Sequence, residues 1–178
     1  MKRLNNVDLE KVMAFGEEFK RNPSKARRPQ VLEGEWNLKE GQVQFRSPIQ
    51  FEGGQTTFEA DNPTFMGGGG TLPGPMHYCF FGLASCYTGV FAIMATMLGI
   101  ELKRVTTCVE ADLNFSRMYG IGDQPPMEEV RVKLKVVSDA PVEKIKEAEE
   151  LAQQRCPVVF TMTNIVKLTP SLEILKDR

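Results

Sequence analysis

The spacing of apolar and polar residues in the first third of the chain predicts one helix and a small sheet. Residues 8–20 carry apolar side chains at helical intervals, and Asp8 stands where it can cap that helix. Three strand-like stretches follow, at 31–38, 42–51 and 55–60, separated by the turn-forming pairs Glu40-Gly41 and Gly53-Gly54. We therefore expect an N-terminal helix followed by an antiparallel meander of three strands.

The middle of the chain predicts longer elements. Pro75 suits the first turn of a helix and Gly99 suits its end, so a long helix is expected between them. Residues 101–115 and 130–136 then alternate between apolar and polar side chains, as strands with one buried face do. Cys108 falls on the polar face of the first of these strands, which gives it no evident role.

The last part of the chain predicts one helix and one short strand. The helix runs from about Pro141 to Arg155, with Ser138 or Asp139 as its cap. Its buried stripe is expected to consist of Val142, Ile145, Ala148, Leu151 and Ala152. Residues 164–168 predict the last strand. This order of helices and strands is typical of an α+β domain over residues 31–178, preceded by a helix and linker in 1–30.

No charged residue interrupts the chain from Met76 to Ile100, a length that could span a bilayer. Several glycines and alanines, a histidine and two cysteines lie within this stretch, and no basic cluster flanks it. These features favour a buried central helix of a globular protein or dimer over a membrane anchor.

Composition narrows the possible partners. The chain has 178 residues, a formal net charge of -1 and 25% charged residues, so nothing in it favours nucleic acid or an anionic membrane. There is one histidine and no zinc-like spacing of the four cysteines, so no metal and no other cofactor is expected. The four glycines at 67–70 lack the Lys-Ser/Thr of a phosphate-binding loop. The polar segment after Met1-Lys2-Arg3 is unlike a signal peptide, and we expect a cytoplasmic, reducing location.

Two cysteines far apart in the sequence, Cys86 and Cys156, suggest a redox site. Cys86 lies within the long helix, and Cys156 lies where the last helix meets Pro157. One thiol could attack an oxidant and the other could resolve the product as a transient disulfide. Cys79 lies about 10 Å from Cys86 along the same helix, which is too far for a disulfide. The alternative is that both cysteines are small core residues, a common role for free cysteine.

Two short motifs resemble a known family. Asp61-Asn62-Pro63, a glycine-rich loop, Gly74-Pro75 and Ala84-Ser85-Cys86 are similar to the osmotically inducible protein C (OsmC) and organic hydroperoxide resistance family, as is the later Cys156-Pro157-Val158. The resemblance covers about residues 31–170. It implies an OsmC-like fold, with antiparallel sheets packed on a long buried central helix, in an intertwined homodimer with active sites at the subunit interface.

The resemblance also implies an activity in the oxidative stress response. Cys86 would reduce an organic hydroperoxide and become a sulfenic acid, and Cys156 would condense with it to a disulfide. A dithiol reductant, in the family often a lipoyl group, would restore both thiols.

The chain departs from the family pattern at the groups that activate the first thiol. Family peroxidases carry a glutamate after the helix-opening proline and an arginine near an early turn, where this chain has Met76 and Gln42. Candidate replacements from the sequence are the cations Lys39, Arg46 and Arg155 and the histidine His77.

This departure leaves other functions open. An OsmC-fold protein without efficient peroxidase activity could bind a small apolar or sulfur-containing ligand between its subunits. The expected lining of that pocket is Met76, Phe80, Phe81 and Phe91. A purely structural dimer module is the third possibility.

Overall fold

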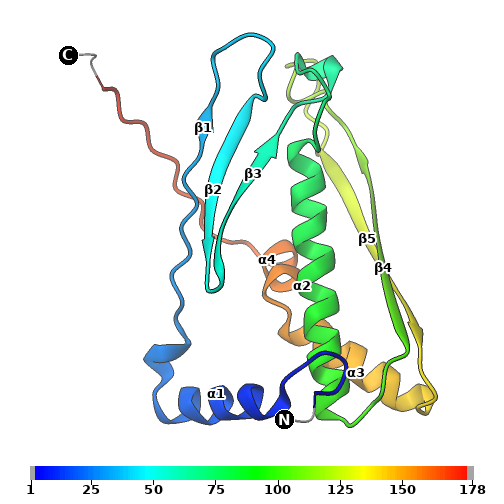
Figure 1. The fold of residues 1–178 in the computed structure, drawn as a ribbon. Helices are drawn as coiled ribbons and strands as arrows, with labels where there is room; N and C mark the ends of the chain where they lie inside the picture. The colour runs from blue at the N-terminus through cyan, green and yellow to red at the C-terminus, as the bar shows by residue number, and fades with distance from the viewer. Residues whose placement is uncertain (1–2, 176–178) are drawn as a thin grey trace.

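The structure is a computed structural model that describes residues 3–175. Its helices and strands give an α+β fold in which two small antiparallel sheets lie on opposite sides of one long helix (Figure 1). In chain order the elements are α1 (Leu9–Arg21), η1 (Pro23–Ala26), β1 (Glu35–Trp36), β2 (Phe45–Phe51), β3 (Gly54–Ala60), η2 (Thr64–Met66), α2 (Pro75–Met97), β4 (Arg104–Leu113), β5 (Met127–Val137), α3 (Val142–Arg155) and α4 (Pro157–Thr163).

The long helix α2 forms as the sequence predicts. Pro75 occupies its first turn, and Gly99 follows its end with a positive φ of 69°, a conformation that glycine adopts without strain. The buried core lies along the second half of α2, where α3 packs against it. This core consists of Tyr87, Phe91, Met94, Ala95, Ile100, Ala148, Ala152 and Cys156.

The two-stranded sheet β4–β5 covers one side of α2 and follows the predicted alternation. Val105, Val109 and the other apolar residues of β4 are partly buried, whereas Thr106 and Glu110 are exposed. On β5, Val132 and Val136 pack against the core. Because side chains alternate across a strand, one apolar face of this sheet can pack on the helix while the other meets water.

The three-stranded sheet β1-β2-β3 is smaller than predicted. The hairpin β2–β3 is paired along its whole length, from Phe45 opposite Ala60 to Phe51 opposite Gly54. The predicted strand 31–38 is wrong except for Glu35–Trp36, since only these two residues find a partner, on β2. In the register of Glu35–Trp36, residues 33–34 come opposite Ser47 and Pro48 of β2, but Pro48 has no N–H to donate, and the Glu33 carbonyl is bonded by the Ser47 side chain instead.

The end of the chain differs most from the prediction. Residues 164–168 form no strand, and Ile165 is fully exposed without a neighbouring strand. The residues before them form a helix that the sequence analysis missed, α4, which begins at Pro157. Proline is common at the first position of a helix, and that signal was available in the sequence.

The structure also corrects the predicted cap of α3. Its N-cap is Pro141, without a side-chain hydrogen bond, so neither Ser138 nor Asp139 caps it. The hydroxyl of Ser138 instead accepts a hydrogen bond from the Ala140 N–H and donates one to the Glu101 carbonyl. Val142 is 63% exposed because it lies at the first turn, beyond the core, whereas Ala148 and Ala152 are buried as expected.

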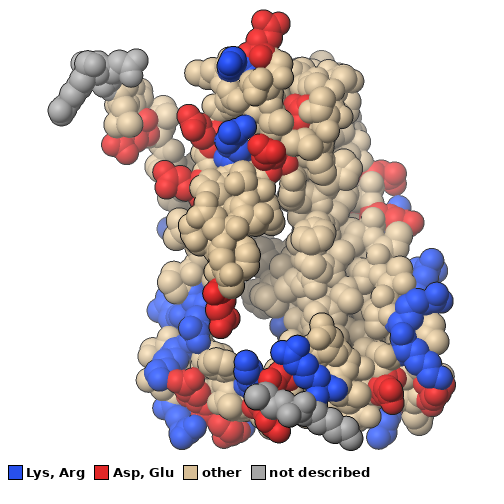
Figure 2. Space-filling model, viewed as in Figure 1, with Lys and Arg blue, Asp and Glu red and all other residues tan. Residues whose placement is uncertain are grey.

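The N-terminal helix α1 forms as predicted, with Asp8 accepting a hydrogen bond from the Lys11 N–H at 3.1 Å. None of its residues is buried. Figure 2 shows an opening between α1 and the tip of the β2–β3 hairpin, and charged side chains of both signs around α1. The helix therefore lies apart from the core.

One helix among residues 3–175, α2, is long and apolar enough to cross a membrane by length and composition. A third of its most apolar stretch is buried within the chain, and core helices of globular proteins meet the same criterion. Large apolar side chains of α2 remain exposed in the single chain, including Phe81 at 66% and Met97 at 42%.

Candidate redox site

Cys86 and Cys156 meet between α2 and the junction of α3 with α4. Cys86 lies midway along α2, and Cys156 is at once the residue that ends α3 and the residue that precedes α4. Pro157 disfavours helical geometry at the residue before it, so Cys156 has an extended backbone and the chain turns there. The turn places the Cys156 sulfur 3.5 Å from the Cys86 sulfur.

The two thiols differ in exposure. Cys156 is fully buried, whereas Cys86 is partly exposed. Burial raises the pKa of the Cys86 thiol, the adjoining Cys156 sulfur raises it further, and a hydrogen bond from the Val158 N–H opposes both. Val158 stands in the first turn of α4, where backbone N–H groups have no partner within the helix. Its N–H is therefore available to the Cys86 sulfur.

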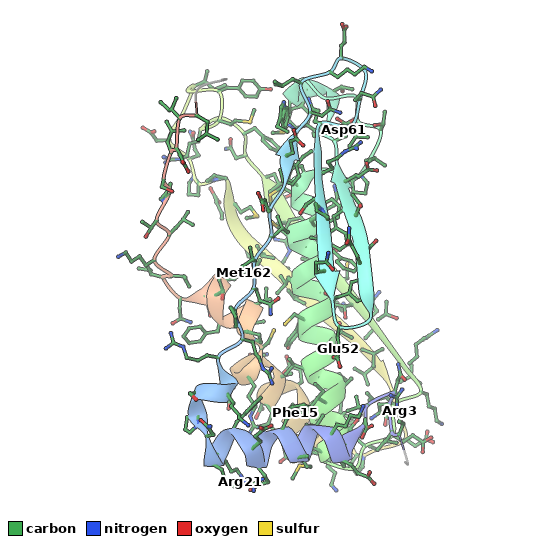
Figure 3. The ribbon with its side chains drawn as sticks, turned by 60° about the vertical axis from the view of Figure 1, so that its left-hand side comes forward. Arg3, Phe15, Arg21, Glu52, Asp61 and Met162 are labelled. Carbon is green, nitrogen blue, oxygen red and sulfur yellow. The ribbon has the colours of Figure 1, made fainter. Side chains whose placement is uncertain are left out.

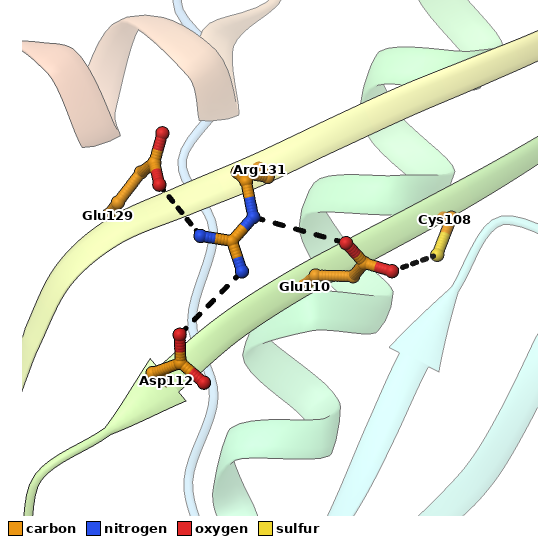
Figure 4. Close-up of polar contacts among 5 residues, drawn as sticks. All are labelled: Cys108, Glu110, Asp112, Glu129 and Arg131. Atoms are coloured by element: carbon orange, nitrogen blue, oxygen red, sulfur yellow. Dashed lines mark hydrogen bonds and ion pairs between the residues drawn. The ribbon is translucent and has the colours of Figure 1, made fainter.

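The other two cysteines lie elsewhere. Cys79 is exposed, two turns before Cys86 on α2. Cys108 lies on the outer face of β4, with its sulfur 3.6 Å from a carboxylate oxygen of Glu110 (Figure 4). No group of three or more His, Cys, Asp or Glu side chains within residues 3–175 is arranged to hold a metal ion.

Comparison with known proteins identifies the family. A family model described as "OsmC-like protein" matches residues 68–171, more than half of the chain and including both cysteines. The chain belongs to the OsmC-like family. A comparison with curated protein sequences found no significant match.

Solved structures of other OsmC-like proteins share the fold. An OsmC-like protein from Mycoplasma pneumoniae matches with a TM-score of 0.58 and 19% identity, over 78% of this chain and 89% of that one. An organic hydroperoxide resistance protein OsmC from Legionella pneumophila matches with a TM-score of 0.52 and 15% identity, over 76% and 91% of the two chains. At such low identity these similarities show the fold alone.

The cations proposed from the sequence do not reach Cys86 within the chain. Arg46 pairs with Glu59 at 3.4 Å across the β2–β3 hairpin. The Glu59 carbonyl accepts a hydrogen bond from Tyr78, in the first turn of α2. Tyr78 precedes Cys86 by eight residues, which is about 12 Å along a helix. Arg46 is thus held near the start of α2, and Lys39 is exposed in the β1–β2 connection, on the same sheet.

Arg155 and His77 also have other partners. The Arg155 guanidinium lies 3.4 Å from the Met94 sulfur, two turns beyond Cys86. The Nδ1 atom of His77 accepts a hydrogen bond from the Gly74 N–H at 3.1 Å, so this histidine caps α2. No lysine or arginine within residues 3–175 is among the groups that set the pKa of Cys86.

The four apolar residues expected to line a ligand pocket between subunits lie along α2 and differ in exposure within the single chain. Phe91 is fully buried in the core, whereas Phe81 is 66% exposed on the surface of α2. Met76 and Phe80 are partly buried near the start of that helix. A different pocket, of about 420 Å³, lies between α2, β5 and α4, and none of these four residues lines it.

A buried tyrosine beside Cys86 was missed by the sequence analysis. The Tyr87 hydroxyl donates a hydrogen bond to a carboxylate oxygen of Glu149 on α3, and Gln153 donates to the same oxygen. Burial and this carboxylate raise the pKa of Tyr87. The contact ties the turn of α2 that carries Cys86 to the helix that carries Cys156 at its end. No sequence signal pairs these two residues, which are 62 positions apart.

Asp61 has a structural role that its motif did not reveal. Its carboxylate accepts hydrogen bonds from the Thr71 N–H at 2.9 Å, the Thr71 hydroxyl at 2.8 Å and the Gly69 N–H at 3.3 Å. The contacts with Thr71, then Gly69, lower the pKa of Asp61. Figure 3 shows Asp61 at the end of the molecule far from α1, where this aspartate holds the glycine-rich loop.

Proposed function

We propose that this OsmC-like protein is a thiol-dependent peroxidase that reduces organic hydroperoxides, with Cys86 as the attacking and Cys156 as the resolving cysteine. The observation that carries the proposal is the 3.5 Å separation of the two sulfur atoms. Cys86 is partly exposed and able to meet a substrate, while Cys156 is buried behind it. Family membership supports the same chemistry, since relatives of the family include an organic hydroperoxide resistance protein.

The cycle balances with a dithiol as reductant. The Cys86 thiolate attacks the O–O bond, so the peroxide leaves as an alcohol after taking up a proton, and the sulfur becomes a sulfenic acid. The Cys156 thiol then displaces the sulfenic hydroxyl as water and forms the disulfide. The sulfur atoms must approach from 3.5 Å to the bond length of about 2.05 Å for this step. An external dithiol, such as a lipoyl group, reduces the disulfide and becomes oxidised itself.

We further propose that two copies of the chain form a homodimer through the exposed apolar face of α2. Phe81 and Met97 on this helix are exposed in the single chain, and the surface around the middle of α2 carries few charges in Figure 2. Large exposed apolar patches mark interaction sites. Phe81→Ala should weaken self-association in analytical ultracentrifugation without changing the circular dichroism spectrum. A wild-type chain that stays monomeric at all concentrations would contradict the dimer.

The peroxidase proposal is tested by stopped-flow reduction of cumene hydroperoxide. Cys86→Ser should abolish the reaction. Cys156→Ser should keep the first turnover, accumulate a sulfenic acid that dimedone traps, and lose the disulfide-dependent steady state. Cys79→Ser, an exposed cysteine of the same helix, is the matched control and should behave as wild type. Wild-type protein no faster than free cysteine would overturn the proposal.

One observation favours a second function. Burial raises the pKa of the Cys86 thiol, and the family glutamate and arginine are replaced by Met76 and Gln42. A thiol that is mostly protonated at neutral pH is a slow nucleophile. The second candidate is therefore a small-molecule-binding or redirected redox protein of the same fold, which would bind a small apolar or sulfur-containing ligand and show no fast turnover in the same assay.

A further inference from the structure

The pocket between α2, β5 and α4 has an apolar floor and an acidic mouth. Its volume is about 420 Å³, within the range of ligand pockets. The buried Leu83 and the partly buried Val130 and Val132 form its floor. Two exposed carboxylates, Glu128 and Glu129, stand at the mouth. The remaining lining residues are Met127, Val159, Met162 and Thr163.

Two of the helices that line this pocket, α2 and α4, also position the cysteine pair. Leu83 precedes Cys86 by three residues on α2, so the two side chains lie on neighbouring positions of one helix face. Val159 follows Val158, whose N–H is hydrogen-bonded to the Cys86 sulfur. An apolar group held in the pocket would therefore lie beside the Cys86 thiol.

A β-bulge places both carboxylates at the mouth. Val130 pairs with Ala111 and Met127 pairs with Leu113, so three steps on β5 match two steps on β4. The extra residue interrupts the alternation and leaves Glu128 and Glu129 exposed in succession. With strict alternation, Glu128 would share the inner face with Val130 and Val132. Bulges are over-represented next to active sites, where they redirect side chains.

The charge at the mouth remains negative after local pairing. Arg131 does not line the pocket but lies on the outer face of the sheet, where three carboxylates surround it, Glu129 at 2.7 Å, Asp112 at 3.7 Å and Glu110 at 3.9 Å (Figure 4). Of the two carboxylates that do line the pocket, Glu129 shares this guanidinium with two others, and Glu128 forms no ion pair within residues 3–175. An anionic ligand approaching this end of the sheet would meet like charge, which disfavours its binding.

We propose that this pocket receives the apolar part of the hydroperoxide and that Glu128 and Glu129 select neutral or cationic hydroperoxides against carboxylates. The inference rests on the proposed peroxidase activity and adds its substrate class. A fatty-acid hydroperoxide would enter with its chain, but its carboxylate would stand at an acidic mouth. The corresponding ester has the same chain without the charge.

The test compares linoleic acid hydroperoxide with its methyl ester in stopped-flow single turnovers, at concentrations below micelle formation. Wild-type protein should prefer the ester by about five-fold in kcat/KM, because two like charges at contact range in water oppose the acid. The double variant Glu128→Gln, Glu129→Gln should raise the rate with the acid and leave the ester unchanged. Glu52→Gln, at the tip of the β2–β3 hairpin (Figure 3), is the matched control and should alter neither rate.

A second variant tests the pocket itself. Met162 lines the pocket and is 45% exposed on α4, so Met162→Trp can fill the space without disturbing the core. It should raise KM for the ester while leaving the reaction with hydrogen peroxide unchanged. Equal rates for acid and ester, or an unchanged KM in Met162→Trp, would overturn the inference while leaving peroxidase activity in place. Failure to reduce any hydroperoxide would instead contradict the proposed function.

Discussion

Asn5 anchors the N-terminal segment to the far end of α2. Its side-chain amide donates hydrogen bonds to the Thr96 hydroxyl at 3.0 Å and to the Ile100 carbonyl at 2.8 Å. Its side-chain oxygen accepts a hydrogen bond from the Leu102 N–H at 2.8 Å. Three contacts from one side chain therefore connect α1 and the segment before it to the link between α2 and β4.

The neighbouring residue supplies an internal control for a substitution at Asn5. Asn5 and Asn6 both have positive φ values, 53° and 61°, so alanine at either position carries a similar backbone strain. Of these two residues, only Asn5 makes side-chain hydrogen bonds among the contacts of residues 3–175. The difference between Asn5→Ala and Asn6→Ala thus isolates these three bonds.

Three hydrogen bonds at a net value of about 0.5–1.5 kcal/mol each stabilise the attachment by roughly 2–4 kcal/mol. We expect Asn5→Ala to speed hydrogen exchange of the Leu102 amide at least about thirty-fold more than Asn6→Ala does, since 1.4 kcal/mol is a factor of ten. Thermal unfolding of the whole domain should change less, because the segment can detach without unfolding the core. Equal exchange in the two variants would refute the reasoning.

Two further predictions concern the redox site. Because burial raises the pKa of Cys86, the rate of its alkylation by iodoacetamide should rise with pH to a midpoint above about 8.5, the ordinary pKa of a free thiol. A midpoint below that value would show that a cation reaches the sulfur in solution. Tyr87→Phe removes the hydrogen bond to Glu149, a bond to a charged group, and should lower the free energy of unfolding in urea by about 1.5–3 kcal/mol. The same variant should slow disulfide closure relative to the first turnover, whereas a Glu150→Gln control on the exposed side of α3 should do neither.

Much of the fold could be predicted because its signals are local. The alternation of 101–115 and 130–136 identifies two strands with one buried face, and the structure pairs them as β4 and β5. Pro75 and Gly99 mark the ends of α2 through their own backbone preferences. Such features depend on residues a few positions apart.

The errors share one physical cause, which is that strand formation depends on a partner. Residues 31–34 and 164–168 have strand-like composition, yet the first stretch meets Pro48 of β2, which has no N–H to donate, and the second pairs with no strand within the described chain. The β-branched residues Val158 and Val159 similarly favour a strand, but the preceding Pro157 starts a helix that packs on α2. In the first two stretches the lack of a pairing partner overrode local preference, whereas Pro157 is itself a local signal for the start of α4.

The sequence likewise predicts only part of the candidate site. The sequence identifies the two cysteines, but no spacing rule gives the 3.5 Å between their sulfur atoms. Nor could it show that Arg46 is paired with Glu59 on the hairpin, since that depends on the β2–β3 register. The pairing opposite Glu59 makes Arg46 part of the sheet surface.

One turn of the chain affects both the pKa of Cys86 and its disulfide formation with Cys156. Pro157 ends α3 and begins α4, which positions the Cys156 sulfur and directs the Val158 N–H to the Cys86 sulfur. The only group that lowers the pKa of Cys86 within residues 3–175 therefore belongs to the same turn as its resolving partner. Formation of a disulfide must move Cys156 and Cys86 together, and that movement changes the Val158 contact as well. When the turn at Pro157 moves toward Cys86, it brings both the Cys156 thiol and the Val158 N–H closer to the Cys86 sulfur. The Cys86 thiolate is therefore best stabilised in the conformation in which the disulfide can form.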